Sequence, residues 1–393
     1  MVRPFRRRRH FHREVRRLIN ELVPGAGYDE VDADTIHVGS LIIGLTNLRA
    51  KWDLLDPEDR LPWLREALPA LVSPPAIPRR LESTRDLRPG LRPRSMLEAA
   101  RLANLNGEVN PERIPNRPLI PFQPFGGDLV SVLLWDAPNT MSVVDQAQLD
   151  EWRARFADLL PVAIDNLADQ PDAGWTVIKN RVWVSLNEDD YDGARMLIPG
   201  HLDKTGLAGE LVVIHPNRSM LAVTAVDDAK GIRRACELVL ETLRDPSPVS
   251  FQPLVGRGDD WRPLVLPPSH PGHEAWQRLI CVNDQMIHNS LRQPLQALLG
   301  DDLFVAGFEV GESSEGTYCS VTNWTEWQPS LLPRTDLICL VTERGEAITA
   351  PWDAVHRLVG PLMEPTDHYP ELWRVETFPS TSELSKLRNL SSS

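Results

Sequence analysis

LVVIHPNRSMLAVTAVDDAKGIRRACELVLETL, residues 211–243, is the stretch that decides the fold class of this chain. Two apolar runs, 211–215 and 220–226, flank the turn-forming residues 216–219 and are typical of a β-hairpin. After Asp228 the spacing becomes helical, with apolar residues at Ile232, Ala235, Cys236, Val239, Leu240 and Leu243. This narrow apolar stripe suits a helix that lies on a sheet, so an α+β fold is predicted.

The hairpin and its helix complete a larger unit, which we place at residues 126–266. Buried-strand patterns at 129–135 and 141–144 and a second hairpin pattern at 175–186 precede them. Between these strands, apolar residues from Leu149 to Leu160 follow helical spacing, and Pro161 is expected to end that helix or to start another. The unit therefore has the order helix, strands, helix.

Residues 11–73 show a similar order. A helix is predicted from the apolar residues Val15, Leu18, Ile19 and Leu22, which share one helical face. A hairpin pattern follows at 35–45, and Asp56-Pro57 is typical of the start of a second helix. The chain is thus predicted to contain two helix–strand–strand–helix units, the first preceded by a basic N-terminal arm at residues 1–10.

Proline content marks the remaining boundaries. Ten prolines lie between residues 74 and 124, so 74–125 is predicted to be a connecting region with one helix that begins at Ser95. A second proline-rich break at 263–272 precedes a separate C-terminal α+β domain at 267–379. Its predicted elements are a helix at 276–299, strands at 303–310, 317–324, 337–341 and 372–377, and a helix at 352–358. The serine-rich end, 380–393, is predicted to be a flexible tail.

Charge and hydropathy restrict the setting. The net charge of −13 disfavours nonspecific binding to nucleic acid or anionic membranes. No secretion signal or stretch of about 20 apolar residues is present, so a cytoplasmic protein without membrane association is predicted. The basic arm is the exception, because Arg6, Arg7, Arg8 and Arg9 form a candidate contact for an anionic partner.

No local motif identifies a reaction. The four cysteines are widely spaced, and neither His10-Phe-His12 nor His270-Pro-Gly-His273 has the spacing of a zinc-hydrolase motif, so no metal site is predicted. Gly256-Arg-Gly-Asp259 lacks the Lys-Ser/Thr of a phosphate loop, and no cofactor is predicted. Catalytic residues stay unknown, since a triad assembled from distant positions would not be visible in one sequence.

One resemblance extends over about residues 11–253. The segments Asp189-Asp-Tyr-Asp-Gly-Ala-Arg-Met-Leu197, Gly209-Glu-Leu-Val-Val213 and Met220-Leu-Ala-Val223 resemble the YtpQ-like bacterial family of unknown function, and Gly126-Gly-Asp-Leu-Val130 sits where that family has a similar feature. The C-terminal third is not matched. The resemblance implies an α+β fold and a bacterial cytoplasmic setting, but it implies no chemistry.

The same acidic segment supplies the named site hypothesis. Tyr191, Asp192 and Arg195 are predicted to lie on one turn and to bind a ligand or partner. Alternatively, Glu188, Asp189, Asp190 and Asp192 cap the helix that follows and stabilise its positive end. A third interpretation is that these carboxylates bind a hard cation, although the segment lacks the EF-hand pattern.

A second candidate surface is aromatic. Trp324 and Trp327 place two indoles just beyond a predicted strand, where they would form an exposed recognition patch or belong to the core. The leading functional prediction is a protein–protein interaction or adaptor module with an unidentified protein partner. The alternatives are a hydrolase-like enzyme whose site assembles only on folding, and nucleic-acid association through the arginine arm.

Overall fold

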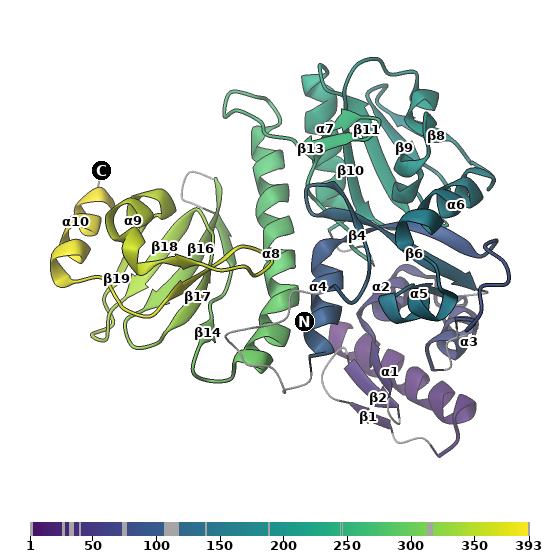
Figure 1. Cartoon of the computed structure of the whole chain (residues 1–393), viewed down its shortest axis with the longest axis horizontal. Coiled ribbons are helices and arrows are strands. Elements are labelled where there is room, and N and C mark those ends of the chain that lie inside the picture. Colours follow the sequence, from purple (N-terminus) through teal and green to yellow (C-terminus); the bar gives the residue numbers. More distant parts are fainter. Residues whose placement is uncertain are drawn as a thin grey trace.

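The structure, a computed structural model of the whole chain, describes residues 3–25, 28–30, 35–38, 41–72, 77–105, 118–137, 140–187, 189–243, 245, 247–312 and 317–391. Several sheets, antiparallel and mixed, combine with helices, so the protein has the predicted α+β fold (Figure 1). Among the helices of these residues, none has the length and apolar composition needed to cross a membrane.

The N-terminal unit packs three helices around a small sheet. Its helices are α1 (Arg3–Leu22), α2 (Thr46–Leu54) and α3 (Arg60–Val72), and its strands are β1 (Tyr28–Glu30), β2 (Thr35–Val38) and β3 (Leu41–Gly44). The sheet is antiparallel in the order β1-β2-β3. Phe11, Trp52, Leu64 and Leu68 fill the core. The predicted first helix and hairpin are confirmed, whereas β1 and α2 were not predicted from the sequence.

Helix α1 corrects one predicted boundary. It begins at Arg3 and continues without a break to Leu22, so residues 3–10 are the first turns of a helix and not a separate arm. The physical reason is that Pro4 lies in the first turn, where a proline is tolerated, and that the arginines after it are good helix formers.

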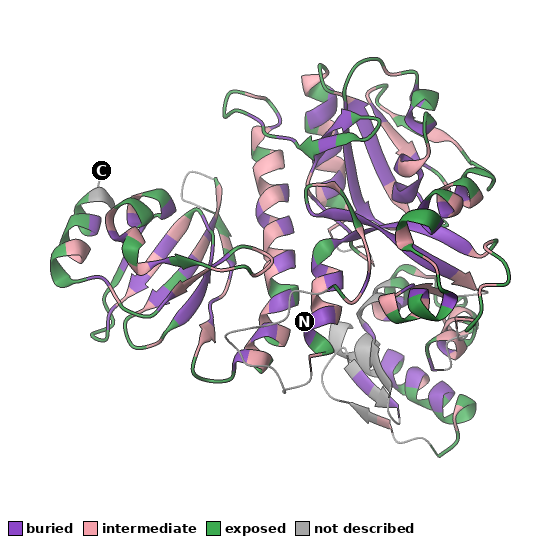
Figure 2. Ribbon diagram, in the orientation of Figure 1, coloured by how far each residue is buried: buried purple, intermediate pink, exposed green. Residues whose placement is uncertain are grey.

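The central body contains two sheets. The first has the order β4-β6-β5, with β7 also paired to β6, and the second has the order β13-β12-β10-β11-β9-β8. The strands are β4 (Leu87–Pro93), β5 (Gln123–Gly126), β6 (Leu129–Ala137), β7 (Thr140–Val143), β8 (Trp175–Ile178), β9 (Val182–Ser185), β10 (Leu211–Asn217), β11 (Met220–Ala225), β12 (Leu254–Arg257) and β13 (Asp260–Pro263). The helices are α4 (Arg94–Ala103), α5 (Gln146–Trp152), α6 (Phe156–Ala168), α7 (Ala229–Glu241) and the short 3-10 helices η2 (Gly193–Leu197) and η3 (His201–Thr205). Strands β6, β10 and β11 are buried along most of their length (Figure 2).

The decisive stretch folds as predicted. Strands β10 and β11 pair as an antiparallel hairpin, and α7 packs on the same sheet with Ile232, Ala235, Cys236 and Val239 buried. Asp228 caps α7 by accepting a hydrogen bond from the backbone N–H of Gly231 at 3.0 Å.

Strand β4 shows that residues 87–93 of the proline-rich segment 74–125 belong to a sheet and not to a connecting region. Its seven residues pair with β6 from Leu87↔Trp135 to Pro93↔Leu129. Pro89 and Pro93 are tolerated because β4 is paired on one side only within the described sheet, and an edge strand can lack N–H donors on its free side. The central body therefore begins near residue 77 and includes α4, which starts at Arg94 and not at Ser95.

Pro161 also departs from its expected role, because it lies inside α6. The carbonyl group that the proline ring leaves without its helical hydrogen bond belongs to Ala157, four residues earlier. Ala157 is exposed, so water can satisfy that carbonyl and the helix continues.

The C-terminal part follows the long helix α8 (His273–Leu299), which stands between the central body and two further sheets (Figure 1). Those sheets have the orders β14-β17-β21-β20 and β15-β16-β18-β19. Their strands are β14 (Phe304–Val305), β15 (Glu309–Glu312), β16 (Tyr318–Thr325), β17 (Ser330–Pro333), β18 (Leu337–Val341), β19 (Ala347–Pro351), β20 (Glu364–Pro365) and β21 (Leu372–Val375). Helices α9 (Trp352–Val359), η4 (Gly360–Leu362) and α10 (Thr381–Ser391) accompany them. The predicted strand at 303–310 is thus two strands in different sheets.

The end of the chain is not the flexible tail that the sequence analysis predicts. Residues 381–391 form α10, and Leu387 is fully buried in the C-terminal core. Ser380 and Glu383 explain the helix, because the Ser380 N–H donates to the Glu383 carboxylate at 2.8 Å and the Glu383 N–H donates back to the Ser380 hydroxyl at 3.4 Å. This reciprocal capping box fixes the first turn.

Candidate functional site

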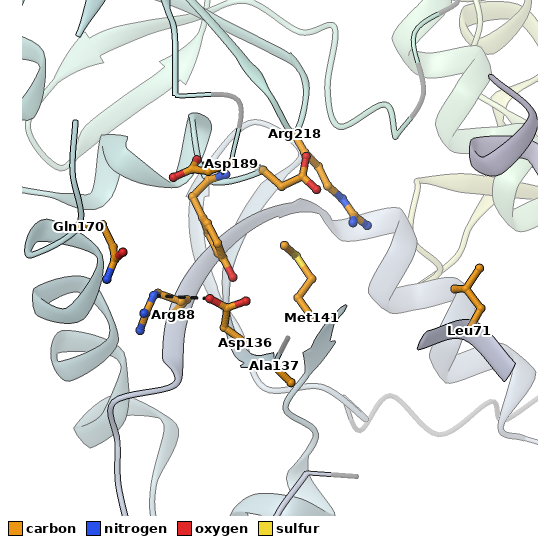
Figure 3. Close-up of a pocket in the computed structure, with 10 residues that line it drawn as sticks. Leu71, Arg88, Asp136, Ala137, Met141, Gln170, Asp189 and Arg218 are labelled. Carbon is orange, nitrogen blue, oxygen red and sulfur yellow. Dashed lines mark hydrogen bonds and ion pairs between the residues drawn. The ribbon is translucent and has the colours of Figure 1, made fainter. Parts of the chain in front are cut away.

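A polar pocket of about 600 Å³ opens where the N-terminal unit meets the central body (Figure 3). It is lined by Leu71, Arg88, Asp136, Ala137, Met141, Gln170, Asp189, Asp190, Tyr191 and Arg218. The volume is within the range of roughly 300–1,000 Å³ that small-molecule sites occupy. Half of the lining residues are arginine or aspartate, so the pocket is the main candidate for a functional site.

Strand pairing places the basic and acidic groups of the pocket. Arg88 and Arg92 are four residues apart on β4, so their side chains leave the same face of the strand. Arg88 pairs with Leu134 of β6, and Asp136, two residues further along β6, lies opposite Met141 of β7. These side chains share one face of the sheet.

Arg88 is anchored on the wall of the pocket. One guanidinium nitrogen donates to the carbonyl oxygens of Arg85 at 2.5 Å and Leu87 at 2.9 Å. Nε lies 3.9 Å from the Asp136 carboxylate, and Figure 3 shows the two side chains turned toward one another. Burial raises the pKa of Asp136. The pair is therefore loose, with hydrogen-bonding capacity left on both groups.

Arg92 lies behind the pocket wall, only 3% exposed. Its guanidinium donates to the Leu91 carbonyl at 2.8 Å and to the Met141 sulfur at 3.2 Å, and it makes no ion pair with another described residue. Burial and the positive charge of Arg218 lower the pKa of Arg92 to about 10, so it stays charged at neutral pH. A buried cation without a carboxylate partner is costly, which makes this position unusual.

Arg218 comes from the β10–β11 turn. The Asn217 side chain holds this turn by accepting a hydrogen bond from the Ser219 N–H at 3.1 Å. The Ser219 hydroxyl in turn donates to Asp190 at 2.8 Å, which ties the turn to the segment before η2. Within the described part of the chain Arg218 itself has neither a hydrogen bond nor an ion pair, and it is only half-buried. Its guanidinium is available to a ligand.

Tyr191 is the member of the predicted trio that lines the pocket. Its hydroxyl is buried beside the Asp136 carboxyl, but it makes no hydrogen bond of normal geometry with a described residue. Burial, together with the nearby Asp136 carboxyl, raises the pKa of the Tyr191 phenol, so the hydroxyl keeps its proton and can donate. A buried hydroxyl without a hydrogen-bond partner destabilises the folded protein, and a ligand that bonds to it removes this cost.

Asp192 and Arg195 lie behind Tyr191 and are fully buried. Arg195 donates to both oxygens of Asp189, at 2.8 and 2.7 Å. Although burial opposes it, this contact with Arg195 lowers the pKa of Asp189. Asp192 accepts from the backbone and side-chain amides of Asn187 at 3.2 and 3.3 Å. The structure thus separates the trio, since only Tyr191 is open to the pocket.

Asp189, Asp190 and Asp192 do not cap the helix as the alternative predicts, and Glu188 lies outside the described residues. Asp192 is the N-cap residue of η2, but no side-chain hydrogen bond caps the helix. Asp189 is instead committed to Arg195 and Asp190 to Ser219. The acidic residues therefore hold the loop in shape, and Asp190 adopts a left-handed backbone conformation with φ of 66°.

His215 and Gly193 form a tight contact beneath this loop. A Cβ atom on Gly193 would lie 2.2 Å from the His215 Nε2 atom, so only glycine fits. His215 donates from Nδ1 to the Met220 carbonyl at 2.9 Å. Burial lowers the pKa of His215 to about 4, and the charges of Arg92 and Arg218 act in the same direction. The imidazole is neutral and packs η2 against β10.

The other predicted sites are not brought to the pocket. Trp324 is 1% exposed and belongs to the C-terminal core, whereas Trp327 is 55% exposed, so the predicted patch of two exposed indoles is wrong. Trp324 is buried because alternate residues of β16 face the core. Arg6, Arg7, Arg8 and Arg9 lie in α1, but their side chains are outside the described residues.

Sequence reasoning missed Arg88, Arg92, Asp136 and Arg218. One signal was present, because Leu-Arg-Pro occurs twice in the seven residues of β4 and repeats an arginine on one strand face. The proline content concealed it. Asp136 and Arg218 carried no local signal, since the fold alone brings residues 88, 136 and 218 together.

Comparison with models of known protein families, with curated proteins and with solved structures found no match for this chain. The resemblance to the YtpQ-like family stays a prediction.

Proposed function

We propose that the protein binds a small polar molecule in the pocket between α3, β4 and the β10–β11 turn. The observation that carries this proposal is the set of unused hydrogen-bonding groups around one cavity. Arg218 has no described partner, the Tyr191 hydroxyl is buried without one, and Arg88 meets Asp136 only at 3.9 Å. Buried polar groups in folded proteins are normally satisfied, and a bound molecule would satisfy these.

The pocket favours ligand binding over the adaptor hypothesis. A recognition patch for a protein partner would be a shallow apolar surface, and the burial of Trp324 removes half of the patch proposed for that role. A pocket with converging ionisable groups is the usual form of a small-molecule site.

The ionisation of three groups in and behind the pocket wall also favours binding over the hydrolase-like alternative. Arg92 remains charged, Tyr191 remains protonated, and Asp189 is held by two hydrogen bonds. Groups with fixed protonation states donate and accept hydrogen bonds, whereas general acid–base catalysis needs a group that titrates near the working pH.

The direct test compares small molecules released from purified full-length chains. We expect the wild-type protein to retain a polar molecule that denaturation releases, and Met141→Trp, which fills the pocket from β7, to retain none. Trp327→Ala, on the far C-terminal part, is the matched control and should retain it. Equal small-molecule content in wild type and a folded Met141→Trp variant, checked by circular dichroism, would argue against the proposal.

A further inference from the structure

We infer that the ligand of this pocket is a small anion, with one carboxylate or phosphate group seated at Arg218 and hydroxyl groups directed toward Tyr191 and Asp136. This inference rests on the proposed binding function and adds the chemical class of the ligand. It draws on three features: two guanidinium groups beside one carboxylate, the absence of an ion pair at a buried arginine, and the kind of polar groups on the opposite wall.

The first feature is the distribution of charge. Among the carboxylates of the site, Asp136 faces Arg88, and Asp189 is bound by Arg195. Of the described carboxylates that line the pocket, Asp190 is the one left near Arg92 and Arg218, and it accepts a hydrogen bond from Ser219. Two guanidinium groups thus share one carboxylate. The lining as a whole is not positive, because it contains three carboxylates and two guanidinium groups, so the anion site is confined to the surroundings of Arg92 and Arg218.

The second feature is the depth of Arg92. Arg92 is 3% exposed, its guanidinium is held by a backbone carbonyl and a thioether, and the charge of Arg218, which lines the pocket, acts on it. Two like charges of this kind repel each other unless an anion lies between or beside them. Arginine is also the side chain best suited to carboxylate and phosphate oxygens, because it can donate two parallel hydrogen bonds.

The third feature is the wall opposite Arg218. Tyr191 offers a protonated hydroxyl, Gln170 an amide, and Asp136 a carboxyl with a raised pKa. These groups donate to and accept from neutral hydroxyl groups. The lining therefore combines one site for an anion with several partners for hydroxyl groups, and its aliphatic members among the described residues are Leu71, Ala137 and Met141.

Four probe molecules test separately whether the pocket recognises the anionic group and the hydroxyl groups of the ligand. Titration calorimetry on the full-length chain would use glucose 6-phosphate, gluconate, glucose and inorganic phosphate. We expect both hydroxylated anions to bind, glucose to bind at least about tenfold more weakly, and added salt to weaken the anions selectively. The ratio of the dissociation constants of glucose 6-phosphate and gluconate then shows whether the site at Arg218 prefers a phosphate or a carboxylate group.

The variant Arg218→Gln tests the anion site itself. Because Arg218 makes no described structural contact, the variant should fold and lose about tenfold or more in affinity for the anionic probes. Arg155→Gln is the matched control, since it removes an equally positive but exposed charge at the residue before α6 and should bind as wild type does.

Equal binding of glucose and glucose 6-phosphate, unchanged anion binding by Arg218→Gln, or no binding of any probe would overturn the inference. These outcomes are distinct from failure of the proposed function. A neutral or cationic molecule that is retained by wild type and lost in Met141→Trp would leave the binding function standing, whereas the absence of any retained molecule would remove both.

Discussion

The pocket and the interior beneath α8 both contain buried charged groups, but their hydrogen bonding differs. Beneath α8, the Ser250 hydroxyl and the Asn283 amide donate to the two oxygens of Asp128, at 2.7 and 3.4 Å. The Asn283 carbonyl oxygen accepts from the Phe251 N–H at 2.8 Å. We call these residues, Asp128, Ser250 and Asn283, the junction cluster. In the pocket, by contrast, Tyr191 and Arg218 lack described partners. A satisfied network stabilises the fold, and an unsatisfied one beside a cavity favours a ligand.

The largest effect is expected in the junction cluster. Asn283→Ala removes a donor from Asp128 and the acceptor of the Phe251 N–H, so both are left buried without that partner. We expect a loss of about 3 kcal/mol in the free energy of unfolding. Urea denaturation followed by circular dichroism measures it. A loss below about 1 kcal/mol would mean that the cluster is not structurally important and would weaken the contrast with the pocket.

The second largest loss of stability is expected at Gly193, in the layer behind the pocket. Gly193→Ala places a methyl group 2.2 Å from the His215 ring, so η2 or β10 must shift. We expect a loss of about 2 kcal/mol, within the range for overpacked interiors. Gly311→Ala, where a Cβ atom would meet nothing within 4 Å and the backbone is not left-handed, controls for the addition of a methyl group without the contact. If both variants lose the same amount, the contact with His215 is not the cause.

Acid should weaken the central body through its buried histidines. Burial lowers the pKa of both His215 and His201 to about 4, against 6.5 in the unfolded chain. Because the unfolded chain binds more protons in that interval, the stability is complete above pH 6.5 and falls as the pH drops toward 4. His215→Gln should flatten the fall in the free energy of unfolding between those pH values. An unchanged slope would show that His215 titrates normally.

Asp284, which lies next to Asn283 of the junction cluster, should make the free energy of unfolding depend on pH in the opposite direction. Burial and the Asp128 carboxylate raise the pKa of Asp284, on α8, to about 7. The folded state then holds a proton that the unfolded state releases near pH 4, so this contribution to stability falls as the pH rises from 4 through 7. Asp284→Asn should remove that part of the pH dependence. Denaturation midpoints at pH 5 and pH 8 would show it, and equal pH dependence in the two proteins would contradict it.

The sequence predicts well where local periodicity coincides with burial. The β10–β11 hairpin and α7 follow from residues 211–243, because the apolar spacing and the Asp228 cap are contiguous in the chain. Strand β4 could not be recognised in the same way, since its prolines are compatible with a strand only at a sheet edge, and edge position is a property of the whole sheet. Helix α10 was predictable from the Ser380–Glu383 capping box, which the serine-rich composition obscured.

The candidate site was predictable only in part. Tyr191 belongs to the conspicuous acidic segment and lines the pocket, but Asp192 and Arg195 in the same segment are buried. Which side of a one-turn helix faces a cavity depends on what packs behind it, here His215 from a strand more than twenty residues away. Arg218 is the clearest case, because a lone arginine in a turn has significance only beside Arg92.

The smallest effect on stability is expected for Arg218→Gln. The side chain makes no described structural contact and borders open space, so the free energy of unfolding should change by less than about 0.5 kcal/mol, or rise as repulsion with Arg92 is relieved. Thermal denaturation of the two proteins without ligand measures this. A loss above about 2 kcal/mol would place Arg218 with the structural groups of the junction cluster.

The central claim is tested most directly by native mass spectrometry of the full-length protein, followed by denaturation of the same sample. If the pocket holds a ligand, the native mass of the wild-type protein should exceed the mass of the chain alone, and the difference should disappear on denaturation. The difference should be absent from Met141→Trp and smaller in Arg218→Gln. Native and denatured masses that agree in all three proteins, with no shift on addition of glucose 6-phosphate or gluconate, would contradict it.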